Sequence, residues 1–91
     1  ALGDYSRAID YHQQSLAMKK EIYSDRPHPD VAGSLLNLGN VYDSLGDYKH
    51  AIDHYLQSLK MEKELHNKRP HPNIATTLNN LFNSYFHLGQ Y

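Results

Sequence analysis

The chain has 91 residues, of which 40% are hydrophobic and 21% are charged, and its net charge is −1. This composition is typical of a soluble globular protein. Because the chain has no cysteine, disulfides, thiolate metal sites and thiol catalysis are excluded. The scattered basic residues argue against a nucleic-acid partner, and no apolar run reaches the roughly 18 residues that span a membrane. Because no segment resembles a secretion signal, we expect a cytoplasmic protein.

An internal repeat organises the chain. The sequence Leu-Gly-Asp-Tyr occupies residues 2–5 and 45–48, and Leu-Gly-Gln-Tyr occupies residues 88–91, so successive copies are 43 residues apart. Alignment of the chain with itself at this offset gives 26 identities in 48 paired positions. A fixed period of this size is typical of stacked helical repeats. We therefore expect a single array over residues 1–91, with repeats at 2–44 and 45–87 and the start of a third at 88–91. Since both ends fall within this motif, we also expect the array to be part of a longer one.

The first predicted helix runs from Asp4 to about Ile22. Apolar and half-polar residues recur on one of its faces at steps of three and four, with charged residues opposite. We expect Asp4 to cap this helix, because its carboxylate can accept backbone N–H bonds of the first turn. Gly3 would permit a tight turn before it. The inward face consists of Tyr5, Ala8, Ile9, His12, Leu16 and Lys19.

A loop with two prolines separates the first helix from the second. Pro27 and Pro29 cannot both lie inside a helix, since each lacks an N–H donor and its ring clashes with the preceding turn. Pro29 suits the first turn of a second helix, which we expect to run to Leu45 and to end at Gly46. Its apolar stripe consists of Val31, Leu35, Leu38, Val41, Tyr42 and Leu45.

The second cycle repeats this order. Asp47 is expected to cap a third helix, and after a loop at 67–72 a fourth helix runs from about Asn73 to Leu88. The third helix carries Tyr48, Ala51, Ile52, Tyr55, Leu59 and Leu65, and the fourth carries Ile74, Leu78, Leu81, Tyr85 and Leu88. No stretch alternates as a strand does. The predicted fold is therefore all-α, an α-solenoid of antiparallel helix pairs with four helices in the order B-A-B-A, where A and B denote the first and second helix of a pair.

Two features of the repeat suggest structural roles for particular side chains. His28 and His71 occupy the same place in the two loops, which favours capping of the following A helix over the alternative, a pH-sensitive contact. Small residues occur where helix backbones are expected to approach, with large side chains around them. These small residues are Ala8, Ser15, Gly39, Ala51 and Ser58. Phe82 replaces Gly39 one cycle later, and His12 replaces Tyr55 one cycle earlier.

The order Leu35-x-x-Leu38-Gly39-x-x-Tyr42, followed by Ala51-x-x-x-Tyr55-x-x-Ser58, resembles the tetratricopeptide repeat family. The usual period of that repeat is about 34 residues, and the excess here fits a longer B helix and the Arg-Pro-His-Pro loop. Residues 71–81 are similar to the longer repeats of kinesin light chains. The resemblance implies a non-enzymatic protein–protein interaction module whose A helices line a concave surface and bind an extended peptide or protein partner.

Asparagines on the A helices indicate where such a partner would bind. Asparagine is a poor former of helix interiors, but its amide offers the donor and acceptor that a peptide backbone requires. Stacked repeats would place Asn37 level with Asn80 and Asn40 level with Asn83, with Leu36 and Phe86 as apolar anchors. The alternative is a set of surface amides with no ligand. The predicted groove consists of Leu36, Asn37, Asn40, Asp43, Thr76, Asn79, Asn80, Asn83, Phe86 and His87. Because residues 30–45 and 73–88 contain no Lys or Arg, recognition of a terminal carboxylate is disfavoured.

Other functions have less support in the sequence. Asp10 and Asp53 are equivalent positions on a solvated helix face, so no catalytic residue is assigned. His50 and His54 have a spacing that suits two metal ligands, but no third ligand lies nearby, and neither a metal nor a cofactor is expected. Each terminal helix would expose an apolar face for want of a neighbour. The alternative function is therefore a structural spacer or self-assembling repeat, forming a homo-oligomer through these helices.

Overall fold

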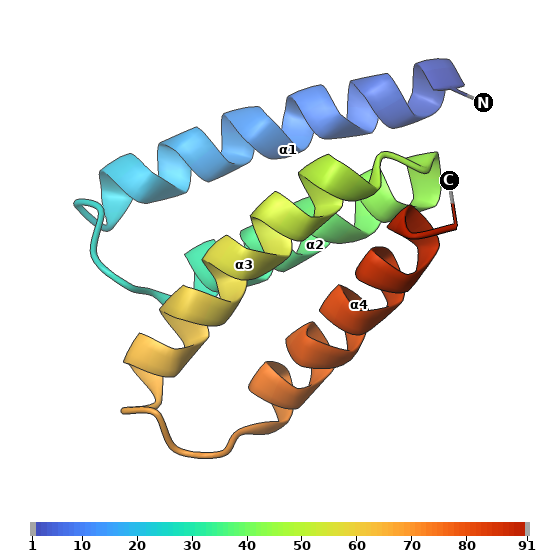
Figure 1. The fold of residues 1–91 in the computed structure, drawn as a ribbon. Coiled ribbons are helices and arrows are strands. Elements are labelled where there is room, and N and C mark those ends of the chain that lie inside the picture. The colour runs from blue at the N-terminus through green and yellow to red at the C-terminus, as the bar shows by residue number, and fades with distance from the viewer. Residues whose placement is uncertain (1, 91) are drawn as a thin grey trace.

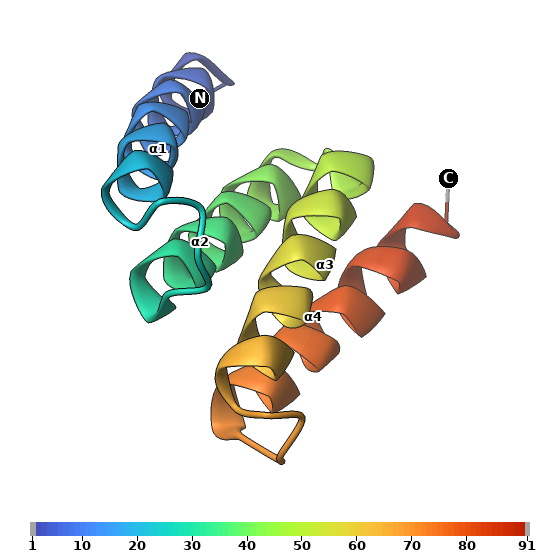
Figure 2. The ribbon, with the colours of Figure 1, turned by 90° about the vertical axis from the view of Figure 1, so that its left-hand side faces the viewer.

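The computed structural model describes residues 2–90, with side chains from residue 3 onward. Its helices are α1 (Leu2–Ile22), α2 (Pro29–Leu45), α3 (Tyr48–Leu65) and α4 (Pro72–Leu88), and no strand occurs within the described residues. Figures 1 and 2 show them following one another across the molecule in chain order, with α1 and α4 at opposite ends. The predicted all-α fold is confirmed, with α1 and α3 as B helices and α2 and α4 as A helices. None of these helices has the length and apolar character needed to cross a membrane.

Each A helix begins with a histidine cap. Nδ1 of His28 accepts a hydrogen bond from the backbone N–H of Asp30 at 3.1 Å, and Nδ1 of His71 accepts one from Asn73 at 3.1 Å. Both histidines have extended backbones, and a proline follows each at the first helical position, where its missing N–H is not needed. The structural role predicted for the two histidines is confirmed.

The loops before these caps share a backbone conformation that the sequence did not indicate. Two consecutive residues in each loop are left-handed although neither is glycine: Ser24 and Asp25 with φ of 53° and 58°, and Asn67 and Lys68 with φ of 52° and 61°. This conformation ends the B helix, since the N–H of Lys68 turns back to the carbonyl of Lys63 at 2.8 Å and satisfies an acceptor that the helix end leaves open.

The turn at residues 45–48 joins α2 to α3 as predicted. Gly46 is left-handed, with φ of 89°, a conformation that a residue without Cβ adopts at little cost. Asp47 caps α3, because its Oδ1 accepts the N–H of His50 at 3.3 Å.

The other two copies of this turn differ from the prediction. The helix α1 already begins at Leu2, so the cap at Asp4 and the turn at Gly3 are wrong. Gly3 and Asp4 lie instead within the first turn of α1. Gly89 is right-handed, with φ of −68°, and so differs from the left-handed Gly46. Tyr91, the last residue of the third copy, and Ala1 lie outside the described residues.

The core consists of two clusters on either side of the α2–α3 pair. The first joins α1 to α2 through Leu16, Val31, Leu35 and Leu38, and the second joins α3 to α4 through Ala51, Ile52, Tyr55 and Leu81. Where α2 and α3 meet, a Cβ on Gly39 would overlap the ring of Tyr55 and lie 3.0 Å from its Cζ. Ser58 is buried there and donates to the carbonyl of Ala32 at 3.0 Å.

Three residues expected at helix contacts are exposed instead. Leu78 and Tyr85 of α4 are 49% and 53% exposed, and Ser15 of α1 is also exposed. The apolar stripe of α4 was predicted correctly at Ile74 and Leu81, which are buried. No helix among the described residues covers Leu78, Tyr85 or Ser15, because α1 and α4 each have a neighbour on one side only.

Candidate functional site

All residues of the predicted groove lie on α2 or α4, and we call them together the A-helix face. Their exposure differs along the face, because some side chains also take part in packing between helices. The exposed members are Asn37, Asn40, Thr76, Asn79, Asn83 and Phe86, and the half-buried members are Leu36, Asp43, Asn80 and His87.

Two hydrogen bonds bring α2 and α4 side by side on this face. Nδ2 of Asn80 donates to Oδ1 of Asn40 at 3.4 Å, and Oγ of Ser84 donates to Oδ1 of Asp43 at 2.9 Å. The sequence repeat pairs Asn40 with Asn83, which lies one helical turn further along. The amides of the two helices are therefore linked diagonally rather than level with one another, which differs from the predicted ladder.

Tyr55 supports the face from beneath. Its side chain is only 1% exposed, and its hydroxyl donates to Oδ1 of Asn40 at 2.6 Å. Burial, and after it the negative charge of Asp43, raises the pKa of Tyr55 to about 12. The hydroxyl thus stays protonated and remains a donor. Since Tyr55 and Asn80 both bond the oxygen of Asn40, this side chain would present its NH₂ group to a ligand. Sequence reasoning missed this support, because the repeat pattern identifies Tyr55 only as a core residue.

The two predicted apolar anchors lie in different environments. Leu36 is half-buried and packs against the second core cluster, so much of its surface is already used. Phe86 is 56% exposed. Its ring lies 6.3 Å from that of Phe82 and 5.9 Å from that of His87, which also stacks on Tyr48 at 5.4 Å. Phe86 is thus the larger apolar surface that the A-helix face offers.

The A-helix face has little charge. The helix α4 contains no Asp, Glu, Lys or Arg, and α2 contains only Asp30 and Asp43. The carboxylate of Asp43 already accepts a hydrogen bond from the hydroxyl of Ser84. Neither helix offers an ammonium or guanidinium group for a terminal carboxylate, so neutral hydrogen bonding dominates what the face can do.

The histidine pair considered as metal ligands has other contacts. Nδ1 of His50 lies 2.7 Å from Oδ2 of Asp47, and Nδ1 of His54 lies 2.8 Å from the carbonyl oxygen of His50. Both imidazole rings stack on Tyr42, with centroids 5.1 Å apart in each case. These contacts give both rings a structural role at the start of α3.

A second cluster of metal-ligating residue types was missed by sequence reasoning. Potential ligand atoms of Glu62, His66 and His71 lie within 4.8 Å of one another. The spacing of Glu62 and His66, four residues apart on a helix, was the available signal. His66 lies 3.1 Å from Glu62, and its ring stacks on His71 at 3.7 Å with 8° between the ring planes.

The geometry of this cluster favours a structural role. Nδ1 of His71 accepts the N–H of its capped helix, so the neutral ring carries its proton on Nε2; a metal at either nitrogen would cost the cap. Parallel rings also direct their lone pairs side by side rather than towards one point. In the first repeat Tyr23 stacks on His28 in the same way, at 3.6 Å and 7°. We interpret both as an aromatic ring that supports a capping histidine.

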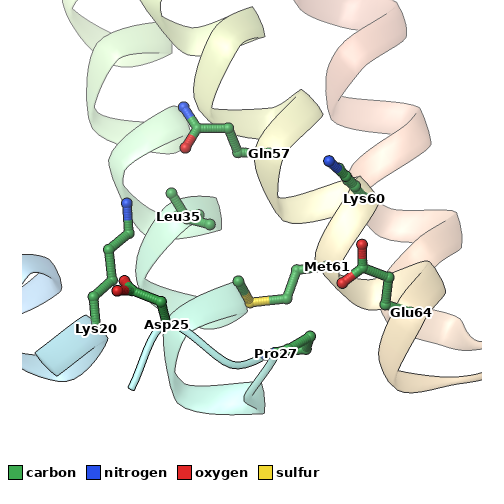
Figure 3. A pocket seen from close by; sticks show the side chains of 8 residues that line it. All are labelled: Lys20, Asp25, Pro27, Leu35, Gln57, Lys60, Met61 and Glu64. Atoms are coloured by element: carbon green, nitrogen blue, oxygen red, sulfur yellow. The ribbon is translucent and has the colours of Figure 1, made fainter. Parts of the chain in front are cut away.

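A cavity of about 280 Å³ lies between α1, α2 and α3, away from the A-helix face (Figure 3). Leu35 and Met61 give it an apolar base, and charged side chains of both signs surround them. No residue of the A-helix face lines it. The lining residues are Lys20, Asp25, Pro27, Leu35, Gln57, Lys60, Met61 and Glu64.

Comparison with known proteins identifies a match at the level of a family. A family model described as tetratricopeptide repeat matches residues 1–64, which is more than two thirds of the chain and includes α1, α2 and nearly all of α3. No curated protein matches the chain.

Proposed function

Because this chain belongs to the tetratricopeptide repeat family, we propose that it is a protein–protein interaction module that binds an extended peptide or protein segment along the A-helix face. Members of this family are generally non-enzymatic scaffolds, and helical repeat arrays bind partners on their extended concave surfaces. The similarity to the longer repeats of kinesin light chains is consistent with the family match.

The observation that carries this proposal is the line of amides between α2 and α4. Asn40 and Asn80 are bonded to each other, and Asn37, Asn79 and Asn83 are exposed beside them. An extended peptide has N–H and C=O groups that need partners, and asparagine supplies both kinds. Side chains already held in place lose less conformational entropy on binding.

The composition of the face favours a particular kind of peptide. With no Lys or Arg on α2 or α4, the contacts would be made to the interior of a peptide rather than to its terminal carboxylate. The exposed ring of Phe86 would receive an apolar side chain. We therefore expect an uncharged, extended segment with an apolar residue that contacts the C-terminal half of α4.

A peptide selected on this chain from a displayed random library tests the proposal. Asn37→Ala and Asn83→Ala should each weaken its binding about two- to tenfold, the effect of losing one hydrogen bond worth about 0.5–1.5 kcal/mol. Gln14→Ala is the control, because this exposed amide lies on α1 and bonds only to Asp10 among the contacts described. If Gln57→Ala weakens binding while both asparagine variants leave it unchanged, the ligand occupies the cavity of Figure 3 instead and the proposal is wrong.

A second function, as a self-assembling repeat or structural spacer, is supported by the apolar side chains exposed at both ends of the array. Tyr11, Met18 and Ile22 of α1 are 71%, 64% and 65% exposed, and Phe82 and Tyr85 of α4 are 66% and 53% exposed. Contiguous apolar surface of this kind marks interaction sites. Sedimentation equilibrium that shows a monomer at every concentration would exclude this function.

A further inference from the structure

We infer that copies of this chain stack head to tail, so that the outer face of α4 in one copy is covered by the outer face of α1 in the next. The inference rests on the self-association proposed above and adds the surfaces, their pairing and their direction. The outer face of α4 consists of Ala75, Leu78, Phe82 and Tyr85, and the outer face of α1 consists of Arg7, Tyr11, Ser15, Met18 and Ile22. Every one of these residues is exposed.

The contact between α2 and α3 supplies the template, since an A helix is covered there by a B helix. The repeat offset of 43 residues relates each outer-face residue to a residue of α2 or α3. The outer face of α4 corresponds to Ala32, Leu35, Gly39 and Tyr42 of α2, and the outer face of α1 corresponds to His50, His54, Ser58, Met61 and Leu65 of α3.

A buried polar contact is retained when the template is transferred. The hydroxyl of Ser58 donates to the carbonyl of Ala32 at 3.0 Å between α3 and α2. At the proposed contact these residues become Ser15 and Ala75, so both residue types are unchanged. Ser15 is exposed within one copy, and stacking would give its hydroxyl the same acceptor that Ser58 has.

The aromatic contacts transfer equally well. Tyr42 stacks on His54 with ring centroids 5.1 Å apart, and the corresponding residues are Tyr85 and Tyr11, again two aromatic rings. Tyr42 also stacks on His50 at 5.1 Å. Arg7 occupies the place of His50, and a guanidinium over the ring of Tyr85 makes a cation–π contact.

The largest mismatch between the template and the proposed contact lies where Gly39 meets Tyr55. In the template, the ring of Tyr55 fills the space beside Gly39. The corresponding residues are Phe82 on α4 and His12 on α1, so the A helix gains a large ring where the B helix carries a smaller one. Gly to Phe adds much more volume than Tyr to His removes, so the two helices must lie farther apart at this position than α2 and α3 do. The Phe82 ring would then occupy the space that the Tyr55 ring fills in the template.

We take a second copy as the occupant, because both matching faces belong to this chain. Within one molecule, α1 and α4 lie at opposite ends of the row and cannot meet (Figures 1 and 2). The contact uses two different surfaces, so it is heterologous, and each added copy exposes a fresh outer face of α4. Such a contact produces open chains, or a ring where the rotation between copies closes, rather than a symmetric dimer.

Sedimentation of three proteins, the wild type, Phe82→Glu and Tyr11→Glu, tests the inference. Both substituted residues are exposed in the single copy, so circular dichroism should show that both variants stay helical. We expect the average mass of the wild type to rise with concentration beyond that of a dimer, whereas each variant alone should remain monomeric. A mixture of the variants should stop at a 1:1 dimer, because one intact α1 face meets one intact α4 face. Leu56→Glu, at an exposed leucine outside both faces, should associate like the wild type.

The outcomes separate the interface from self-association itself. If the wild type remains monomeric, both the inference and the self-assembly function are wrong. If the wild type associates but either variant alone still does so, self-assembly stands and the head-to-tail contact is wrong, because a face has then paired with its own copy. Peptide binding to the A-helix face is independent of each of these results.

Discussion

Replacing Gly39 with alanine tests the close contact between α2 and α3 on which the A-helix face depends. A Cβ at this position would overlap the Tyr55 ring and lie 3.0 Å from its Cζ. The ring is only 1% exposed, so either it must move within the core or the two helices must separate.

The expected magnitude follows from opposing effects. Alanine in a helix is favoured over glycine by about 0.5–1 kcal/mol. An added methyl group in a packed core costs about 1–3 kcal/mol, and the bond from Tyr55 to Asn40, at 2.6 Å, is worth about 0.5–1.5 kcal/mol. We therefore expect Gly39→Ala to lower the free energy of unfolding by about 1–3 kcal/mol.

Urea unfolding followed by circular dichroism measures this change, and Gly33→Ala is the matched control. Gly33 also lies within α2, but a Cβ there meets nothing within 4 Å, so only the propensity gain remains and the control should be slightly stabilised. A double-mutant cycle with Tyr55→Leu completes the test, because a shorter side chain should relieve most of the loss. If Gly39→Ala is as stable as Gly33→Ala, or if the two effects in the cycle simply add, the steric argument fails.

Three further predictions concern single contacts. His71→Ala should lower the free energy of unfolding by about 0.5–2 kcal/mol through loss of the cap, whereas His71→Asn, which keeps an acceptor, should restore most of it in the same urea assay. Ser58→Ala should lower the free energy of unfolding by about 0.5–1.5 kcal/mol, because it removes the hydrogen bond to Ala32. Ser15→Ala, at the exposed equivalent position, should leave the free energy of unfolding unchanged in dilute solution. Equal losses at both positions would contradict the buried hydrogen bond assigned to Ser58. Because an unfolded tyrosine ionises near pH 10 and folded Tyr55 only near a pKa of about 12, the unfolded state loses its proton first and stability falls as pH rises above about 10. Urea titrations up to about pH 12 should show that Tyr55→Phe removes about 2 kcal/mol of that fall, and an unchanged pH profile would contradict the raised pKa.

The sequence repeat was sufficient to predict the helices and several contacts because the same residue types recur at the helix ends and helix contacts of both cycles. Equivalent histidines before equivalent prolines predicted the two caps. A glycine among large side chains predicted that helix backbones approach at Gly39, although it did not identify Tyr55 as the residue in contact. In each case the residue type itself limits what the position can do, so no knowledge of distant neighbours was required.

Features that depend on neighbours were not predictable in the same way. Periodicity identified Leu78 and Tyr85 as an apolar face, but it does not say whether another helix covers that face. Ser24 and Asp25 have left-handed backbone conformations although neither is glycine, so their residue types did not predict these conformations. At the candidate site, the exposure of most asparagines on α2 and α4 followed from their helix positions, although Asn80 is half-buried. The diagonal bond between Asn40 and Asn80 did not, because it depends on the offset between two helices that are not adjacent in the chain.

The proposed binding surface is tested most directly by a nuclear magnetic resonance titration of the chain, labelled with nitrogen-15, with a peptide selected to bind it. The side-chain amides of Asn37, Asn79 and Asn83 give resonances of their own, and these resonances should shift together with the backbone amides of α4 near Phe86. Shifts confined instead to residues that line the cavity between α1, α2 and α3, such as Gln57 and Lys60, with unchanged asparagine resonances, would contradict the assignment of the A-helix face.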